Sequence, residues 1–293
     1  IEQRVKKISL RKQKVNNKKN YKKLTMFIRP CQKIFSALQT KFTTLRTFFF
    51  TQHRKDSFTV SLLQTAVKHI AWTPFRTNEI SQIIELLFDE TKRDSKLPPC
   101  LNSDAWNTRK NAVAFLTIFV ARSGNLLDAK SSDAIVEYIL QRGFQDKQLE
   151  VRNEYKKLLS ILIQSSHLRE ADHIQKLIQQ CIKLADTKLP KPNTKDDSRD
   201  DVDLKIRKKH AGVLGLSAVV ESFPYTVPEW IPNVVSHLCR LDREKDPIGP
   251  TAKKTIAEFK RTHNDEWNTF KKLFTEEQLQ DLQDVGALHS YFS

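Results

Sequence analysis

The residue types that most often carry chemistry are present in this sequence, but their spacing forms no catalytic or metal-binding motif. Eight histidines are scattered along 293 residues, and no HExxH pattern, Walker loop, G-x-S-x-G elbow or dinucleotide fingerprint occurs. The cysteines form no CxxC pair, which argues against a zinc site and a disulfide framework; they are Cys31, Cys100, Cys181 and Cys239. We therefore expect a protein that is not an enzyme, with no catalytic residue and no metal site.

Two short segments could still suggest a ligand site. The segment "HNDE" at 263–266 holds potential metal ligands, but on one helical turn only some of these side chains converge. We interpret it as a turn that starts a helix before Trp267. The segment "AGVLGL" at 211–216 has glycines at 212 and 215 only, which is not a phosphate-binding loop. Within a helix, Gly212 and Gly215 favour the close approach of a neighbouring helix.

The positive charge is concentrated at the start of the sequence. The formal net charge is +16, and residues 1–23 contain ten Lys or Arg against one acidic residue, Glu2. Such a segment favours binding to polyanions or to a nuclear import receptor. A solvated lysine-rich helix or a disordered arm is the alternative interpretation. A basic segment alone supports attraction to phosphate without sequence recognition, so no specific nucleic acid is predicted.

The sequence predicts a soluble protein of a reducing compartment. Widely separated cysteines fit the cytosol or the nucleus. No charge-free apolar run approaches the roughly 18 residues of a membrane span, and no signal peptide opens the chain, so we expect no membrane partner. The sequence starts with Ile1 and has a single methionine, Met26, which indicates a fragment of a longer protein.

Helices are the elements that must position these residues. The sequence has only six glycines, and its apolar residues recur at spacings of three and four, which is typical of amphipathic helices. We predict a helix over 78–90 and another over 131–142 that stops at Gly143. A further helix over 275–285 should begin with Thr275 and Gln278 as a capping box.

Four helical segments repeat along the chain. They are "WNTRKNAVAFLTIFV" from 106, "LEVRNEYKKLLSILI" from 149, "LKIRKKHAGVLGLSA" from 204 and "PTAKKTIAEFKRTH" from 250. Intervals of 43, 55 and 46 residues separate their starts, and HEAT-type helix pairs repeat about every 40–47 residues. A Pro- and Asp-rich loop near 187–203 accounts for the longest interval.

The fourth position of each repeat is basic, and we interpret it as a structural ladder that bonds to neighbouring loops. The four residues are Arg109, Arg152, Arg207 and Lys253. The predicted fold class is all-α, a HEAT-like α-solenoid of stacked antiparallel helix pairs over 59–285. A basic segment of uncertain order, 1–58, precedes it, and a flexible tail, 286–293, follows.

Several of these segments resemble a known family. "RKKHAGVLGLSAVV" (207–220), "TVPEWIP" (226–232) and "TAKKTIAEFKRTHNDEW" (251–267) are similar to the carboxyl-terminal region of the large HEAT-repeat proteasome activators, the proteasome activator complex subunit 4 family. "QLEVRNEYKKLLSILIQ" (148–164) and "WNTRKNAVAFL" (106–116) are similar in matching order. The resemblance spans roughly 60–293 and is strongest after 204.

The resemblance implies a regulatory protein that cuts nothing itself. Members of the family cap the α-subunit ring of the proteasome core particle and open its gate independently of ATP and ubiquitin. They act in the nucleus and cytoplasm, and they are linked to the degradation of acetylated histones and to DNA repair.

The last residues would then form the proteasome-binding tail. Family members end in a hydrophobic residue, a tyrosine and any residue, which enter a pocket between α subunits where the carboxylate meets a lysine. Tyr291 takes the hydrophobic position, Phe292 the tyrosine position, and Ser293 supplies the carboxylate. Because Phe292 lacks the hydroxyl group, we predict retained docking with weaker gate opening. A frayed end whose aromatic rings fold back on the last repeat is the alternative.

Two further family features transfer less directly. An acetyl-lysine reader in this region depends on an Asn-Phe pair, and Ser166 and His167 occupy the corresponding positions. Serine and histidine replace the amide donor and the apolar wall only crudely, so a helix-end loop is the alternative interpretation, and binding of acetylated histones is in question. Family members also hold inositol phosphates; the candidate polyanion contacts here are Arg207, Lys208 and Lys209, for which a solvated helix start is the alternative.

Two functional hypotheses of different classes follow from the sequence. The first is the carboxyl-terminal HEAT-repeat segment of a proteasome activator. The second is a basic HEAT-repeat scaffold for nucleic acid or nuclear transport, in which the basic arm binds phosphate or carries cargo. Blocking the carboxyl terminus should abolish proteasome contact in the first case, whereas a steep loss of binding with salt would favour the second.

Overall fold

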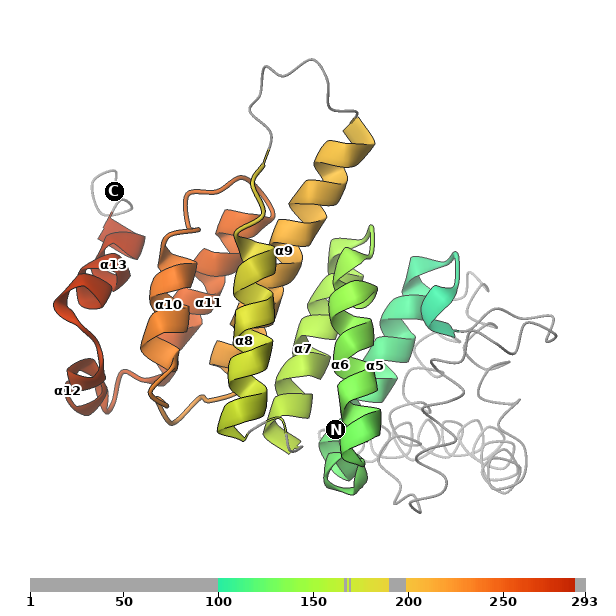
Figure 1. The fold of residues 1–293 in the computed structure, drawn as a ribbon, viewed down its shortest axis with the longest axis horizontal. Coiled ribbons are helices and arrows are strands. Elements are labelled where there is room, and N and C mark those ends of the chain that lie inside the picture. Colours follow the sequence, from blue (N-terminus) through green and yellow to red (C-terminus); the bar gives the residue numbers. More distant parts are fainter. Residues whose placement is uncertain (1–99, 166–167, 169, 190–198, 288–293) are drawn as a thin grey trace, which may run out of the picture.

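The computed structural model describes residues 100–165, 168, 170–189 and 199–287. Within these ranges every regular element is a helix, which confirms the all-α fold class (Figure 1). The α-helices are α5 (Trp106–Ser123), α6 (Ala129–Gln141), α7 (Leu149–Ser165), α8 (Ala171–Ala185), α9 (Arg199–Glu221), α10 (Ile231–Cys239), α11 (Ile248–Thr262), α12 (Trp267–Phe270) and α13 (Glu276–Ala287). Short 3-10 turns are η2 (Cys100–Asn102), η3 (Gly124–Leu126), η4 (Gly143–Gln145) and η6 (Lys271–Leu273).

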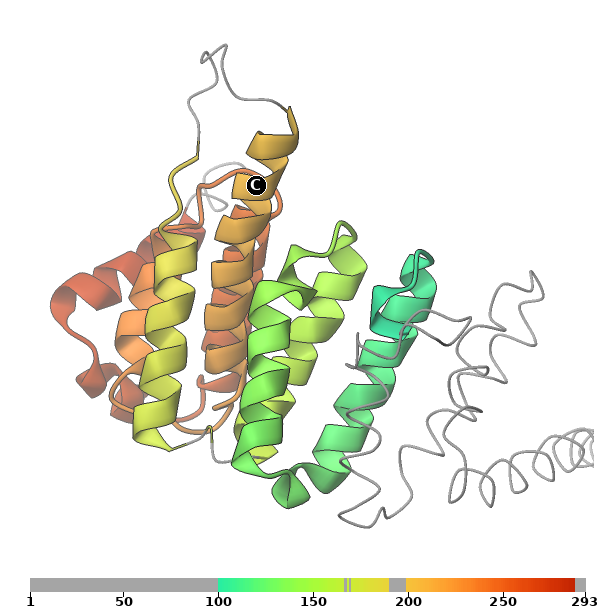
Figure 2. The ribbon, with the colours of Figure 1, turned by 45° about the vertical axis from the view of Figure 1, so that its right-hand side comes forward.

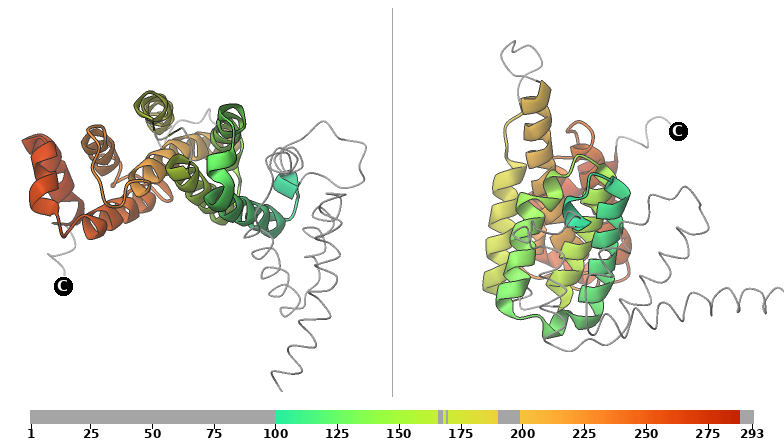
Figure 3. Two further views of the ribbon diagram at one scale, coloured as in Figure 1. Left: turned by 90° about the horizontal axis from the view of Figure 1, so that it is seen from below. Right: turned by 90° about the vertical axis from the view of Figure 1, so that its right-hand side faces the viewer.

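The helices stack side by side in two layers (Figures 1 and 2). Helices α5, α7, α9 and α11 form one layer, and α6, α8 and α10 form the other, as the left view of Figure 3 shows. Successive helices of the first layer pack closely on one another, whereas α6 and α8 scarcely touch. Paired helices stacked in this way form a HEAT-like α-solenoid, as the repeats predict.

The predicted helices inside the described ranges are present. The segment 131–142 corresponds to α6, with Arg142 as its C-cap and Gly143 immediately after it. Asp128 caps its start by accepting a hydrogen bond from the Ser131 backbone N–H at 2.8 Å. The predicted helix over 78–90 and the segment 1–58 lie outside the described residues. None of the helices that the structure describes is long and apolar enough to cross a membrane.

The core lies between the two layers and is rich in aromatic side chains. Phe115 and Phe119 of α5 stack with ring centroids 6.1 Å apart, and both are essentially inaccessible to solvent. Phe144 of η4 and Tyr155 of α7 are equally buried. Burial raises the pKa of Tyr155 well above its usual value. A fully buried ring of this size typically contributes about 1.5–3 kcal/mol, so these four residues fix the packing of the first repeats.

The two glycines of α9 allow α8 to approach closely, as the sequence predicts. A Cβ atom placed on Gly212 would lie 2.2 Å from the backbone nitrogen of Ala185 and 2.5 Å from the carbonyl oxygen of Cys181. At Gly215 the nearest atom would be Cys181 Sγ, at 2.3 Å. Both contacts are far inside van der Waals distance. At Gly212 the obstacle is backbone, so only glycine permits this separation of α8 and α9 there, whereas at Gly215 the obstacle is the Cys181 side chain.

The predicted basic ladder holds at its first member. Arg109 donates to Asp146 from Nε at 2.6 Å and from Nη2 at 2.9 Å, and its Nη1 donates to the Ser103 carbonyl oxygen at 2.6 Å. This pair joins α5 to the loop that precedes α7, which is a structural role. Arg152 is only 6% exposed, and burial followed by the charge of nearby Arg207 lowers its pKa. The last member of the ladder, Lys253, is exposed.

Candidate functional site

Helix α13 is the described element nearest the carboxyl terminus, and it begins with the predicted capping box. The Thr275 backbone N–H donates to Gln278 Oε1 at 3.0 Å, and the Gln278 backbone N–H donates to Thr275 Oγ1 at 3.3 Å. Glu276 and Glu277 place negative charge at the positive end of the helix dipole. The helix continues to Ala287, two residues beyond the end predicted from the sequence.

Helix α10 holds the first turns of α13. Ser236 Oγ donates to Asp281 Oδ2 at 2.6 Å, and Gln278 Nε2 donates to Asn233 Oδ1 at 2.7 Å. Leu282, the residue after Asp281, is 3% exposed and packs into the core. A hydrogen bond to a charged group contributes about 1.5–3 kcal/mol when partly buried. Arg240 also approaches Asp281, at 3.5 Å, but its side chain is 60% exposed, and such surface pairs contribute little.

Helix α11 holds the last turn of α13. Lys260 Nζ donates to the Val285 carbonyl oxygen at 3.3 Å. The last carbonyl groups of a helix lack partners within the helix, and a positive charge is favourable beside them. Neighbouring helices therefore hold both ends of α13, the helix that precedes the last residues of the chain.

An aromatic cluster packs the segment between α11 and α13 against α11. Its members are Phe259, His263, Trp267, Phe270 and Phe274. The rings of Phe259 and His263 lie 4.3 Å apart, and those of Trp267 and Phe274 lie 5.7 Å apart. Rings in contact of this kind contribute about 0.5–1.5 kcal/mol per pair beyond their burial, so the cluster stiffens the turn between the two helices.

His263, the first residue of "HNDE", belongs to this cluster. The side chain is 2% exposed, its Nε2 lies 3.1 Å from the Phe223 carbonyl oxygen, and its Nδ1 lies 3.0 Å from Thr262 Oγ1. Both ring nitrogens are therefore occupied by contacts inside the protein. Helix α12 starts at Trp267, as the turn interpretation predicts. The described residues contain no group of three His, Cys, Asp or Glu side chains that could hold a metal ion.

The three candidate polyanion contacts lie in different environments on α9. Lys209 is 8% exposed, and its Nζ lies 2.5 Å from Glu244 Oε1, so its charge is used inside the protein. Arg207 is half-buried, with no hydrogen-bond partner at Nε among the described residues. Lys208 is exposed. The structure thus presents Lys208 to solvent but does not gather all three on one open patch.

His210, the next residue, is buried and neutral. Burial lowers its pKa to about 3, and the positive charges of Arg152 and Lys156 add to this effect. Its Nε2 lies 3.0 Å from Thr251 Oγ1, whose hydroxyl donates to the Pro247 carbonyl oxygen at 2.7 Å. Since the threonine hydroxyl is already committed as a donor, the proton of the ring is on Nε2. His210 therefore joins α9 to α11.

The other candidate site residues lie outside the described part of the chain. They are the tail residues Tyr291, Phe292 and Ser293 and the acetyl-lysine reader positions Ser166 and His167. The flanking described residues are Ser165, the last residue of α7, and Leu168, which is buried.

Sequence analysis missed the residues that hold α13. Ser236, Asp281 and Lys260 carry no motif, and each bonds to a residue 25 or 45 positions away. Only the capping box, which is local, could be found from sequence spacing. The long-range hydrogen-bond partners could be identified only from the fold.

Comparisons with known proteins match the part of the chain that contains these contacts. The family model described as "Proteasome activator complex subunit 4-like, C-terminal" matches residues 206–293, which include α10 to α13. Proteasome activator complex subunit 4 of Homo sapiens is 32% identical over 235 residues, covering 70% of this chain and 12% of that protein.

Two further relatives match over a similar span. Proteasome activator complex subunit 4B of Danio rerio is 33% identical over 236 residues, covering 70% of this chain and 12% of that protein. Proteasome activator BLM10 of Saccharomyces cerevisiae is 27% identical over 227 residues, covering 76% of this chain and 10% of that protein. The chain thus spans only about an eighth of the length of its first relatives. It belongs to the proteasome activator complex subunit 4 family, and it corresponds to the carboxyl-terminal region of those proteins.

Proposed function

We propose that this chain is the carboxyl-terminal HEAT-repeat segment of an ATP- and ubiquitin-independent proteasome activator, which caps the core particle and helps to open its gate through its last residues. The observation that carries the proposal is the family match over residues 206–293. Relatives that match 70–76% of the chain are named proteasome activators in human, zebrafish and yeast. The proposal includes action in the nucleus and the cytoplasm.

The anchoring of α13 supports a role for the residues that follow it. A short peptide binds well when its base is held and its aromatic anchor enters a pocket, because less freedom is lost on binding. Ser236 and Lys260 hold that base through Asp281 and Val285. In this proposal Tyr291 and Phe292 supply the aromatic anchor and Ser293 the carboxylate, which pairs with a lysine of the α-subunit ring.

The test compares peptide hydrolysis by purified core particles in the presence of four forms of the full chain. These are the unchanged chain, a deletion of residues 291–293, a Phe292→Tyr variant and a Tyr225→Ala control. Tyr225 is 81% exposed and lies between α9 and α10, so its substitution removes an accessible aromatic ring and leaves the sequence of the tail unchanged.

We expect the deletion to abolish stimulation and Tyr225→Ala to leave it unchanged. Phe292→Tyr should raise stimulation several-fold, because one added hydrogen bond is worth about 0.5–1.5 kcal/mol. Equal stimulation by the unchanged chain and the deletion would reject the tail mechanism. Binding to polyanions that survives the deletion, together with no core-particle contact, would favour the basic scaffold instead.

A further inference from the structure

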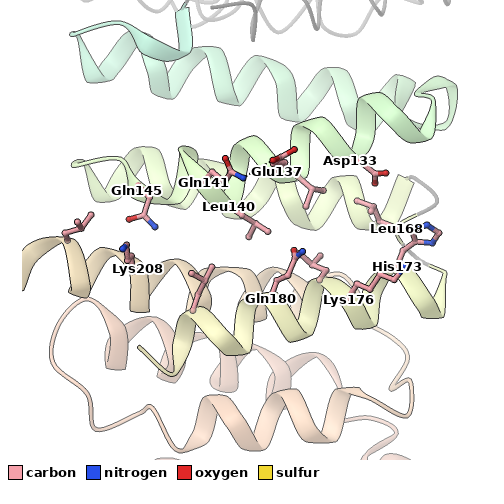
Figure 4. Close-up of a pocket in the computed structure, with 14 residues that line it drawn as sticks. Asp133, Glu137, Leu140, Gln141, Gln145, Leu168, His173, Lys176, Gln180 and Lys208 are labelled. Carbon is pink, nitrogen blue, oxygen red and sulfur yellow. Dashed lines mark hydrogen bonds between the residues drawn. The ribbon is translucent and has the colours of Figure 1, made fainter. Parts of the chain in front are cut away.

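A groove of about 930 Å³ runs between α6 and α8 (Figure 4). These two helices belong to the layer of the solenoid opposite α5 and α7 (Figure 3). Its floor is apolar along its length. Val136 and Leu140 of α6 face Leu177 and Leu184 of α8, and Leu168 closes one end. The exposed Leu204 of α9 also lines the groove.

The groove exists because α8 packs on α9 and not on α6. Of all helix pairs in the described ranges, α8 and α9 make the most extensive contact, while α6 and α8 scarcely touch. The close approach at Gly212 and Gly215 draws α8 toward α9. The space left beside α6 is therefore a feature of how the repeats pack.

The two rims of the groove carry opposite charge. Asp133, Glu137 and Gln141 follow one another along the α6 rim, one helical turn apart, as Figure 4 shows. The opposite rim carries Lys176 of α8 and Lys208 of α9. Glu137, Lys176 and Lys208 are exposed. Glu137 accepts a hydrogen bond from Gln141 Nε2 at 2.9 Å, and within the described ranges no ion pair joins Glu137 to Lys176 or Lys208. The charges of these three residues can therefore pair with a ligand that carries charge on both sides.

We propose that this groove binds an amphipathic α-helix of a partner protein whose two flanks carry opposite charge. The apolar face of that helix packs on Val136, Leu140 and Leu177, its basic flank faces Glu137, and its acidic flank faces Lys176 and Lys208. This inference is independent of the proposed proteasome function, because it involves neither α13 nor the residues after it.

The dimensions fit a helix that is half embedded. The 13 residues of α6 span about 20 Å at 1.5 Å per residue, so a volume of 930 Å³ corresponds to a cross-section of roughly 45 Å². An α-helix with side chains, about 10–12 Å in diameter, has about twice that cross-section. Half of the helix, its apolar face, therefore enters the groove, and its polar face remains in water.

An extended peptide fits this groove less well. Its backbone N–H and C=O groups would face the leucine floor, where they find no partner, and an unpaired buried polar group is costly. A helix satisfies its own backbone. The opposite rims also set its direction, since reversing the helix exchanges its flanks and places like charges together.

The experiment uses the full 293-residue chain and fluorescein-labelled 14-residue peptides, measured by fluorescence polarisation. A split peptide carries leucines on one face, three lysines on one flank and three glutamates on the other. A mixed peptide has the same composition with both charges on each flank. A third peptide is the split peptide with a central proline, which breaks the helix.

The matched protein variants change charge equally at and away from the groove. Lys176→Glu with Lys208→Glu makes both rims acidic. The control, Lys183→Glu with Lys254→Glu, changes two exposed lysines that do not line the groove. Both double variants lower the net charge by the same amount.

We expect the unchanged chain and the control variant to bind the split peptide about three- to tenfold tighter than the mixed peptide, the size expected from several exposed ion pairs. The groove variant should lose this preference, and the proline peptide should bind at least tenfold more weakly. The inference is overturned by any of three results: no saturable binding up to millimolar peptide, a preference that survives in the groove variant, or equal binding of the proline peptide. The last result would assign the groove to an extended segment.

Discussion

Substituting the two glycines of α9 by alanine tests the packing of α8 on α9. In a helix interior, alanine is intrinsically favoured over glycine by about 0.5–1 kcal/mol, so a site with free space would gain stability. At Gly212 the added Cβ atom meets backbone atoms of Ala185 and Cys181 at 2.2 and 2.5 Å. Backbone can move away only if the whole end of α8 shifts. Overpacking typically costs about 1–3 kcal/mol, and at Gly212 we expect the upper end, a net loss of about 2 kcal/mol.

Gly215 differs because its obstacle is a side chain. Its Cβ atom would meet Cys181 Sγ at 2.3 Å, with the next contact, Cys181 Cβ, at 3.3 Å. Removing the sulfur with Cys181→Ala should therefore rescue Gly215→Ala and leave Gly212→Ala unchanged. In a double-mutant cycle we expect a favourable coupling of about 1–2 kcal/mol for the first pair and less than about 0.5 kcal/mol for the second.

Urea unfolding of the single and double variants, followed by far-ultraviolet circular dichroism, measures these free energies. Equal stability of Gly212→Ala and the unchanged chain would show that α8 does not approach α9 as closely as described. Rescue of Gly212→Ala by Cys181→Ala would show that the obstacle there is the sulfur and not the backbone. Either outcome would refute the reasoning.

Two further predictions concern buried polar groups. The pKa of His210 is about 3 in the folded state and about 6.5 in the unfolded chain, so protonation favours unfolding and stability is lost as pH falls from 6.5 toward 3. Between pH 7 and pH 5 this loss is about 2 kcal/mol. His210→Gln removes the titrating group, so the unfolding free energy of the variant should fall over this pH range by about 2 kcal/mol less than that of the unchanged chain. Identical pH profiles of the two proteins would contradict the assignment. Arg109→Met should lower the unfolding free energy by about 1.5–3 kcal/mol, because it leaves Asp146 without its charged partner. Lys253→Met, at the equivalent but exposed position of the last repeat, should change the unfolding free energy by less than about 0.5 kcal/mol. Equal effects of the two substitutions would mean that the Arg109 contact contributes no stability.

Features set by neighbouring residues were predictable from the sequence. The capping box of Thr275 and Gln278, the stop of α6 before Gly143 and the start of α12 at Trp267 depend on residues within a few positions of one another. The helix periodicity and the repeat interval gave the solenoid, because each pair must bury its apolar face on the next. The role of Gly212 followed from its place inside a helical segment.

Features set by contacts between repeats were not predictable. The basic ladder is the clearest example, since its four equivalent positions have different environments. Arg109 is paired with Asp146, Arg152 is buried, Arg207 is half-buried and Lys253 is exposed. Whether a basic side chain finds a carboxylate depends on the loop of the next repeat, which varies in length and sequence. For the same reason, "RKK" at 207–209 suggested one basic patch, while Glu244 removes Lys209 from it.

The glycines of α9 and the groove beside α6 are linked through the packing of α8. In a two-layer solenoid, each helix of the second layer can contact both a helix of the first layer and the adjacent helix of its own layer. For α8 these helices are α9 and α6. Here the absence of side chains at Gly212 and Gly215 lets α8 settle deeply against α9, so little of its surface remains within reach of α6. A bulkier residue at either position would push α8 outward and change the separation of Lys176 from Glu137. The same alanine variants that weaken the α8–α9 contact should therefore also alter peptide affinity at the groove, whereas Arg109→Met, which acts between α5 and the loop before α7, should not.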